Sequence, residues 1–277
     1  MKKLGKILLI ILAVLLALYL ILIAPRTIGQ ADLSHMEGYH YAHRGYHDGN
    51  VEIPENSLLS FQAAIDAGYG IELDIQLSSD KVPMVFHDAD LMRICGAEGK
   101  IWDYTCAELQ QMKLFDTDET IPTLQEALAL IDGQVPILVE YKMDKVDTDV
   151  CAKSHELLTD YSGPSAVQSF HPFALFWYRQ NAKEIPRGIL AKNFLRDNRE
   201  KGEESSIVDF LTTNLLLNVI GYPDFIAYDC IDADYYALHL CRFLGAKTST
   251  WTIKEPAQYE AVKGQFDLYT FEGFPMQ

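Results

Sequence analysis

The strongest constraint on the fold is a regular alternation of short strand-like runs with amphipathic helical patterns. Strand-like runs recur at 39–43, 71–77, 82–86, 136–141, 166–170, 187–190, 225–228, 247–252 and 266–270, and helical patterns fill most of the gaps. Such alternation is typical of a parallel sheet in an α/β domain. Eight strand–helix slots in about 250 residues predict a (β/α)₈ TIM-like barrel. One of the nine runs is therefore surplus, and the repeat is irregular at the expected hairpin 71–86.

The first 27 residues differ from the rest of the chain. Lys2, Lys3 and Lys6 precede residues 7–24, which contain no charged side chain. As a helix this run is roughly 27 Å long, close to the ~30 Å hydrocarbon core of a bilayer. A signal peptide has a shorter apolar region of ~7–15 residues, so we favour an uncleaved transmembrane anchor over a cleaved signal. The excess of lysines before the run predicts a single-pass protein with a cytoplasmic N-terminus and an extracytoplasmic domain.

Composition divides the chain into a basic end with an anchor (1–27), a polar linker (28–38) and one domain (39–277). Residues 1–27 hold four of the 23 Lys and Arg residues and none of the 39 acids, so the remainder carries a formal charge of −20. Nucleic acids and anionic lipid headgroups repel such a surface. We therefore expect no nucleic-acid partner, and membrane association only through the N-terminal helix.

The five cysteines show no C-x-x-C spacing, which argues against a zinc site or a redox motif. Their odd number leaves at least one free thiol. We expect all five to be reduced.

Residues 41–88 carry the chemistry. Two short apolar runs end in His43 and His87, and between them Glu72 and Asp74 alternate with apolar residues. On a strand, these two carboxylates point to one side, about 7 Å apart. A divalent cation with oxygen ligands would offset their repulsion and loss of hydration. With Arg44 for phosphate binding and two imidazoles for proton transfer, the stretch indicates a metal-assisted phosphoester site.

Other polar residues also follow or end predicted strands. Glu140 and Lys142 lie at the end of one strand, and Trp251 near the end of another. In a barrel these strand ends converge on one mouth, where catalytic groups are placed. Glu72, Asp74 and Glu140 then form a set of three carboxylates that suits Mg²⁺ or Ca²⁺. An alternative reading of the first two is a pair of surface acids on an edge strand.

The motifs H-R-G (43–45), P-E-N (54–56), E-x-D (72–74) and H-D (87–88) occur in this order within some 45 residues. Together they resemble the signature of the glycerophosphodiester phosphodiesterase family. The resemblance implies a TIM-like barrel, catalytic histidines at His43 and His87, and metal ligands at Glu72, Asp74 and Glu140. It also implies hydrolysis of a small glycerophosphodiester to an alcohol and glycerol 3-phosphate, with Trp251 packing against the glycerol.

The residues around these motifs have supporting roles in this interpretation. Arg44 and Lys142 provide positive charge for the phosphate. Glu55 either orients Arg44 or reaches the metal through water, and it could also be a helix N-terminal acid. We expect Asn56 to cap the helix predicted over 57–67.

The resemblance fades at the C-terminus, where the family's T-D is replaced by Thr270-Phe271-Glu272. We expect this departure to affect the packing of the terminal loop and not the catalytic set. Three alternatives to a glycerophosphodiesterase stay open: a lysophospholipase D-like enzyme, an enzyme that trims teichoic acids, and a catalytically inactive barrel that only binds its ligand.

Overall fold

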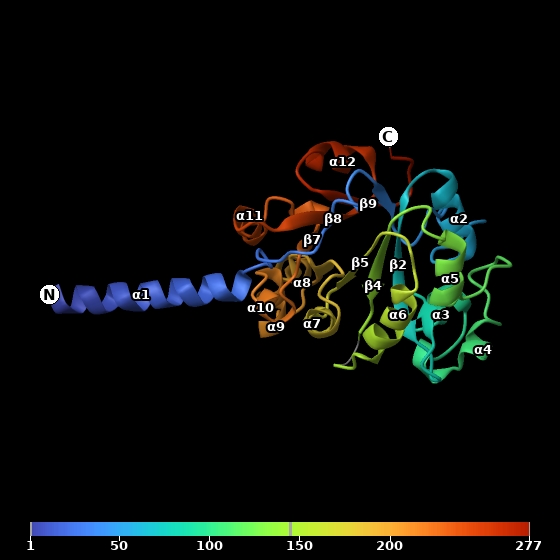
Figure 1. Ribbon diagram of the computed structural model, residues 1–277, viewed down its shortest axis with the longest axis horizontal. Coiled ribbons are helices and arrows are strands. Elements are labelled where there is room, and N and C mark those ends of the chain that lie inside the picture. The colour runs from blue at the N-terminus through green and yellow to red at the C-terminus, as the bar shows by residue number, and fades with distance from the viewer. Residues whose placement is uncertain (1, 144–145, 277) are drawn as a thin grey trace.

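A closed eight-stranded barrel forms the centre of the computed structural model, which describes residues 2–143 and 146–276 (Figure 1). Its strands are β1 (His40–Ala42), β2 (Gly70–Leu77), β4 (Ile137–Tyr141), β5 (Ser165–Ser169), β6 (Arg187–Ala191), β7 (Phe225–Asp229), β8 (Lys247–Ile253) and β9 (Leu268–Phe271). All neighbours are parallel, and β1 pairs with both β2 and β9, which closes the barrel. The predicted fold is confirmed.

The surplus strand is β3 (Pro83–Val85). It pairs antiparallel with the end of β2, whereas β2 pairs directly with β4 inside the barrel. The segment that follows β3 has its own small apolar core, which includes Phe86, Ile94 and Leu109. This insertion holds the H-D motif beside the barrel mouth.

The helices within the described residues mostly follow the predicted pattern. They are α1 (Lys2–Ile23), α2 (Leu58–Asp66), α3 (Met92–Cys95), α4 (Cys106–Leu109), α5 (Leu124–Ile131), α6 (Asp149–Thr159), α7 (Pro172–Asn181), α8 (Phe194–Lys201), α9 (Ile207–Thr213), α10 (Asn218–Gly221), α11 (Tyr236–Phe243) and α12 (Pro256–Val262), with 3₁₀ turns η1 (Ile101–Asp103) and η2 (Cys230–Asp232). Capping boxes at Thr105 and Thr123 begin α4 and α5. The charged run 196–204 is in large part the helix α8, in which no residue is buried.

Both faces of β2 are buried, for different reasons. Ile71, Leu73 and Ile75 belong to the apolar core, which also includes residues of the surrounding helices. Glu72 and Asp74 alternate with them along the strand and are also buried. Because side chains alternate along a strand, the two acids point to the opposite side, into the barrel.

A second apolar cluster includes Tyr41, Leu138 and Phe225, together with Leu33 and Met36 from the segment before the barrel. The hydroxyl of Tyr41 donates a hydrogen bond to the Met36 carbonyl at 2.6 Å. Residues 28–38 therefore do more than connect, because they add apolar side chains to the core of the domain. All five cysteines are free thiols, as expected.

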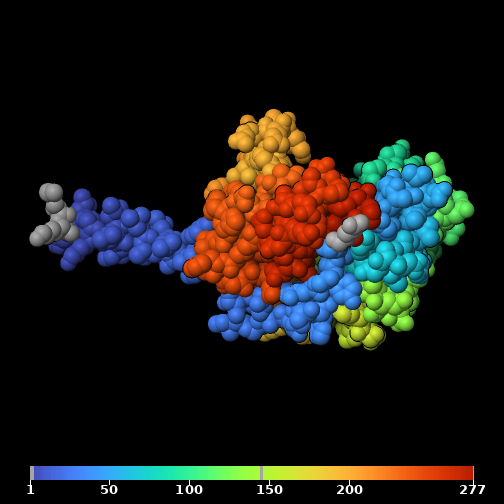
Figure 2. All heavy atoms as spheres, turned by 90° about the horizontal axis from the view of Figure 1, so that it is seen from above, coloured from blue at the N-terminus to red at the C-terminus, as the bar shows by residue number. Residues whose placement is uncertain are grey.

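The N-terminal helix α1 extends away from the barrel as a long rod (Figures 1 and 2). Residues Lys3–Ile23 are long and apolar enough to cross a membrane, and an 18-residue window within them has a mean hydropathy of 3.1. Its last residue, Ile23, is fully buried, and the Asn218 side chain donates to its carbonyl at 2.8 Å. Arg26 then forms an ion pair of 3.2 Å with the buried Asp224. The helix thus joins the domain directly.

Candidate active site

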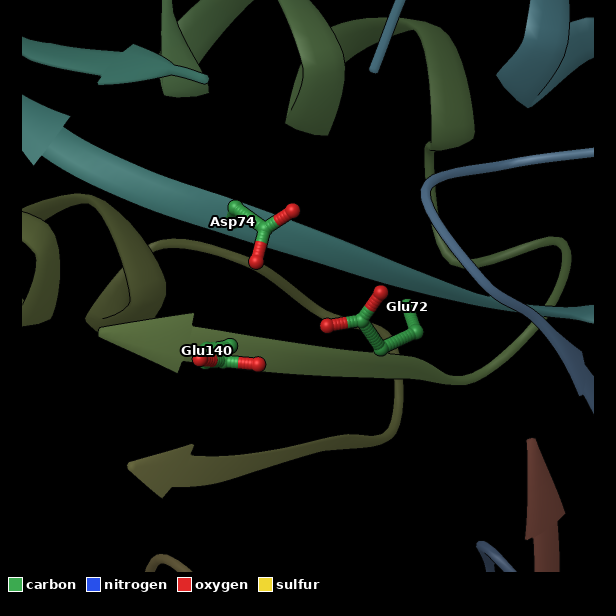
Figure 3. A group of neighbouring side chains, drawn as sticks. All are labelled: Glu72, Asp74 and Glu140. Atoms are coloured by element: carbon green, nitrogen blue, oxygen red, sulfur yellow. The ribbon is translucent and has the colours of Figure 1, made fainter. Parts of the chain in front are cut away.

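Three carboxylates from two neighbouring strands meet inside the barrel. Asp74 on β2 stands opposite Glu140 on β4 in the strand register, and Glu72 lies two residues before Asp74. Figure 3 shows the three carboxylates turned toward a common space. Each offers one oxygen that lies within 4.8 Å of the other two, and all three residues are buried. The alternative reading of surface acids on an edge strand is wrong, since β2 is an interior strand.

The electrostatics of this cluster reflect mutual repulsion in a buried place. Burial, followed by the charges of Asp74 and Glu140, raises the pKa of Glu72 well above its usual range. Burial also raises the pKa of Glu140 to about 7, against the opposing charge of Lys142. Burial acts in the same direction on Asp74, but Lys142 and other nearby cationic groups outweigh it and lower its pKa. Three buried acids of this kind favour a cation between them.

The donor set fits a hard divalent cation. The Oε1 atom of Glu72 is buried and has no hydrogen-bond partner among the described residues. The Lys142 ammonium lies 3.0 Å from Asp74 Oδ1 and also bonds Glu140, so it balances part of the negative charge. Carboxylate oxygens without thiol or imidazole ligands suit Mg²⁺ or Ca²⁺ better than zinc.

The H-R-G motif forms a tight turn at the end of β1 that places Arg44 against the acids. The Arg44 backbone N–H donates to Glu72 Oε2 at 3.0 Å, and its guanidinium Nε lies 3.6 Å from Asp74 Oδ2. Gly45 has a φ of +79°, and a Cβ there would lie 2.3 Å from the Ser60 hydroxyl. Only glycine fits this turn, because both the backbone conformation and the space exclude a side chain.

Glu55 contacts and orients Arg44, which is one of the three roles predicted for it. Its Oε1 accepts a hydrogen bond from Arg44 Nη1 at 2.7 Å and another from Arg93 Nη2 at 2.7 Å. Burial alone would raise the pKa of Glu55, but the hydrogen bonds and charges of Arg93 and Arg44 lower it to about 2. Glu55 is therefore ionised and joins two guanidinium groups.

Asn56 does not cap helix α2, so that prediction is wrong. The N-cap is Ser57, whose hydroxyl accepts from the Ser60 N–H in a capping box. The Asn56 amide instead donates to Asp74 Oδ2 at 2.8 Å. The reason is register: the cap falls one residue later, which frees Asn56 to orient an acid of the cluster.

His43 at the end of β1 is paired with Glu272, which follows β9. Their Nδ1 and Oε2 atoms lie 2.6 Å apart. Burial would raise the pKa of Glu272, but the contact with His43 lowers it to about 2. An ionised carboxylate only accepts, so the proton lies on Nδ1 and Nε2 keeps its lone pair. Burial lowers the pKa of His43 to about 4, so the imidazole is neutral at pH 7.

His87 in the insertion is paired with its neighbour Asp88, with Nδ1 and Oδ1 2.7 Å apart. Arg93 binds the same carboxylate at 2.6 Å, and the buried Gln76 amide donates to the backbone carbonyls of Phe86 and Asp88. These contacts fix the H-D loop against β2. Burial lowers the pKa of His87, although the charge of Asp74 opposes the shift.

A cavity opens at the mouth beside these residues. It measures about 250 Å³ and is lined by His87, Glu140 and Lys142, with Phe170 on its wall. Trp251 contacts Phe170 edge-to-face at 5.3 Å, and its indole N–H donates to the Ala227 carbonyl at 3.0 Å. Trp251 and Phe170 therefore form an aromatic pair beside this cavity.

A sequence model of the glycerophosphoryl diester phosphodiesterase family matches residues 43–264 of this chain, which include both histidines and all three acids. The chain belongs to this family. It is a phosphoric diester hydrolase built on a TIM-like barrel.

Relatives and solved structures agree with this assignment. Glycerophosphodiester phosphodiesterase 1 from Mus musculus is 36% identical over 254 residues, which cover 80% of this chain and 75% of the relative. The Bos taurus enzyme of the same name is 25% identical over 252 residues, with the same coverage. A phosphodiesterase from Oleispira antarctica, solved with its product sn-glycerol-3-phosphate, has a TM-score of 0.69 at 25% identity and covers 87% of this chain and 94% of its own.

Three residues of this phosphodiesterase site were missed by sequence reasoning. Glu272 lies outside the family match and was expected to affect only loop packing, but it bonds directly to His43. The prediction for the terminal loop is therefore wrong. Asp88 could have been found from the sequence, because it is part of the H-D motif. Arg93 carries no such signal, because it reaches Glu55 only through the fold of the insertion.

Proposed function

We propose that this phosphodiesterase hydrolyses glycerophosphodiesters to an alcohol and glycerol 3-phosphate in a reaction that depends on one divalent cation. Glu72, Asp74 and Glu140 would hold the cation, Mg²⁺ or Ca²⁺, and His43 and His87 would transfer protons. The observation that carries the proposal is a buried cluster of three acids with two histidines nearby, each fixed by its own carboxylate.

The charged side chains around the acids suit a phosphodiester. When bound, the cation supplies a Lewis acid that polarises the phosphoryl group. Arg44 and Lys142 add positive charge at the same place, and both are held by the acids. These fixed charges would stabilise the negative charge that accumulates on the phosphoryl oxygens during the reaction. Trp251 and Phe170 would line the path of the organic part of the substrate.

The two histidines would divide the proton transfers. The His43 side chain is only 14% exposed, whereas that of His87 is 30% exposed at the cavity. Deeper burial keeps His43 neutral, so it would take the proton of the attacking hydroxyl, and Glu272 would stabilise the resulting imidazolium. His87, beside the acidic cluster and at the open mouth, would give a proton to the departing alkoxide.

A substrate panel with metal removal tests the proposal. The chain should hydrolyse glycerophosphocholine or glycerophosphoglycerol, lose activity in EDTA, and regain it with Mg²⁺ or Ca²⁺. His43→Ala and Glu72→Ala should each remove most of this turnover, while Phe176→Ala on the surface of α7 should not. Substantial metal-dependent turnover in both site variants would refute the proposal. No turnover by the unmodified chain, with or without added Mg²⁺ or Ca²⁺, would favour an inactive binding barrel.

A second candidate, hydrolysis of lysophospholipids, is favoured by an apolar extension of the cavity. A neighbouring pocket of about 240 Å³ shares Gln76, Lys142 and Met143 with it and continues to Leu77, Trp102 and Val150. An acyl chain needs such a surface. Trp102→Ser should lower turnover of a lyso-lipid but not of its deacylated counterpart. Equal effects on both substrates would exclude a role for this pocket in chain binding.

We also propose that α1 anchors the chain in a membrane, with the N-terminus in the cytoplasm and the domain outside. The length and hydropathy of the helix and the lysines before it support this topology. Protease added to intact cells should degrade the domain. Protection of the domain in intact cells, with cleavage only after lysis, would reverse the orientation.

A further inference from the structure

The junction between α1 and the barrel leaves no flexible spacer. Ile23 is fully buried, and its carbonyl accepts from the Asn218 amide and the Cys241 thiol. Immediately after it, the Arg26 N–H donates to the Pro223 carbonyl, and its side chain pairs with Asp224. A helix end held by so many contacts has a fixed direction relative to the domain. If α1 crosses a membrane, the domain must lie against the lipid on the side where α1 emerges.

The free part of the helix is too short to hold the domain away from the bilayer. Contact with the domain begins at Tyr19, which packs against the barrel core. The apolar residues before it, 7–18, span roughly 18 Å as a helix, against the ~30 Å of a hydrocarbon core. Leu20, Ile21 and Leu22 still expose 36–58% of their surface. These side chains need lipid at the level where the domain already begins.

Helix α11 borders this junction along its whole length. Tyr19 lies within electrostatic range of Tyr236 at its start, Cys241 contacts Ile23, and Gly245 after its end approaches Thr27. Figure 2 shows that residues of this part of the chain, in orange, form the edge of the domain around the base of α1. Whatever medium surrounds the last turns of α1 therefore also meets α11.

The outer face of α11 is largely apolar, and it also carries the half-exposed His239. Ala237, Leu238 and Cys241 are buried in the domain, while Tyr236 and Phe243 are 55% and 86% exposed. Tyr236, Leu240 and Phe243 are spaced four and three residues apart, so they share one side of the helix. Aromatic residues on such a face are typical of helices at a membrane–water interface.

We propose that the domain sits in the interfacial layer of the bilayer, with the Tyr236–Leu240–Phe243 face of α11 in contact with lipid beside α1. This inference rests on the proposed membrane location and goes beyond it, because it fixes how the barrel lies on the bilayer. The contact is apolar and the domain is strongly acidic, so docking requires no anionic lipid and persists at high salt.

The test uses the full-length chain in phosphatidylcholine vesicles. Phe243→Trp adds tryptophan fluorescence at this face. Brominated phosphatidylcholine should quench this added fluorescence at least about twofold, in low or high salt. Met92→Trp is the matched control, because Met92 is 53% exposed on α3, which Figure 1 shows on the far side of the barrel from α1. Its added emission should be equal in brominated and plain vesicles.

Flotation and activity separate the possible failures. The Phe243→Trp chain should float with the vesicles and hydrolyse water-soluble glycerophosphodiesters like the unmodified chain. Unquenched emission from a chain that floats overturns the docking proposal, and a chain that does not float overturns its membrane premise. Quenching is measured without substrate, so it tests docking even if the chain does not have the proposed activity.

Discussion

The two histidine–carboxylate pairs of the site differ in how the chain assembles them. His43 and Glu272 are 229 residues apart and meet only because β9 pairs with β1 to close the barrel. His87 and Asp88 are neighbours in an inserted loop outside the barrel. The first pair depends on the closure of the whole fold, and the second depends on local structure.

This difference extends to the surroundings of each pair. The carboxylate of Glu272 has His43 as a close partner, with Lys254 at 3.7 Å. The carboxylate of Asp88 is shared with Arg93, which also binds Glu55 and through it Arg44. A change at Glu272 should therefore act on one imidazole, whereas a change around Asp88 should spread to Arg44.

Removing either imidazole should have the largest effect. His43→Ala and His87→Ala should each lower kcat about 10²–10⁴-fold with a glycerophosphodiester, the usual size of a general acid–base contribution. A p-nitrophenyl leaving group needs no proton to depart. With such a substrate, most of the lost kcat should return in His87→Ala but not in His43→Ala. Steady-state rates with both substrates check this prediction. If kcat returned in His43→Ala instead, His43 would be the proton donor and His87 the proton acceptor.

Neutralising the carboxylates should show which pair depends more on its charge. Glu272→Gln should lower kcat about 10–100-fold, because the buried His43 imidazolium loses its counter-charge. Asp88→Asn should have a smaller effect, since Arg93 and Gln76 still fix the loop. Comparing kcat for the two variants with one substrate decides the order. A larger loss for Asp88→Asn would mean that the His87–Asp88 pair depends more on its charge than the His43–Glu272 pair.

Arg93→Met should disturb the local pair without touching the other one. Glu55 and Asp88 would lose a bidentate partner, so Arg44 would be less firmly oriented for the phosphate. We expect KM to rise about threefold to tenfold with a smaller change in kcat, as for weakened binding of the substrate. Arg93→Lys keeps the charge but not the fork, and it should restore only part of the loss. An unchanged KM in Arg93→Met would exclude the link to Arg44.

The smallest effect should appear in the pH dependence of stability. Asp88 and Glu272 have a pKa of about 2 in the fold, because contacts with Arg93 and His43 outweigh the effect of burial. Unfolded, such groups titrate near pH ~4, so the unfolded chain binds more protons in between. Their contribution to stability is present above pH ~4.5 and is lost as the pH falls toward 2. Urea midpoints between pH 6 and 3 should fall less steeply in Glu272→Gln and in Asp88→Asn.

Local motifs predicted much of the site because they encode local geometry. The alternation of Ile71, Glu72 and Leu73 predicted that the acids face one way, since side chains on a strand alternate by steric necessity. The hairpin 71–86 was also predicted, because it depends on residues a few positions apart. Asn56 was wrongly predicted as the N-cap of α2, which is the next residue, Ser57. The contact of Asn56 with Asp74 depends on packing across the barrel.

The sequence by itself determined the barrel, the set of acids and imidazoles and the apolar N-terminal helix, because periodicity and motif spacing act over short distances. Only the tertiary structure decided that Glu272 completes the His43 pair, that β3 lies outside the barrel, and that Ile23 and Arg26 fix α1 to the domain. These contacts join residues far apart in the chain. Their partners are selected by barrel closure and burial, which no local pattern specifies.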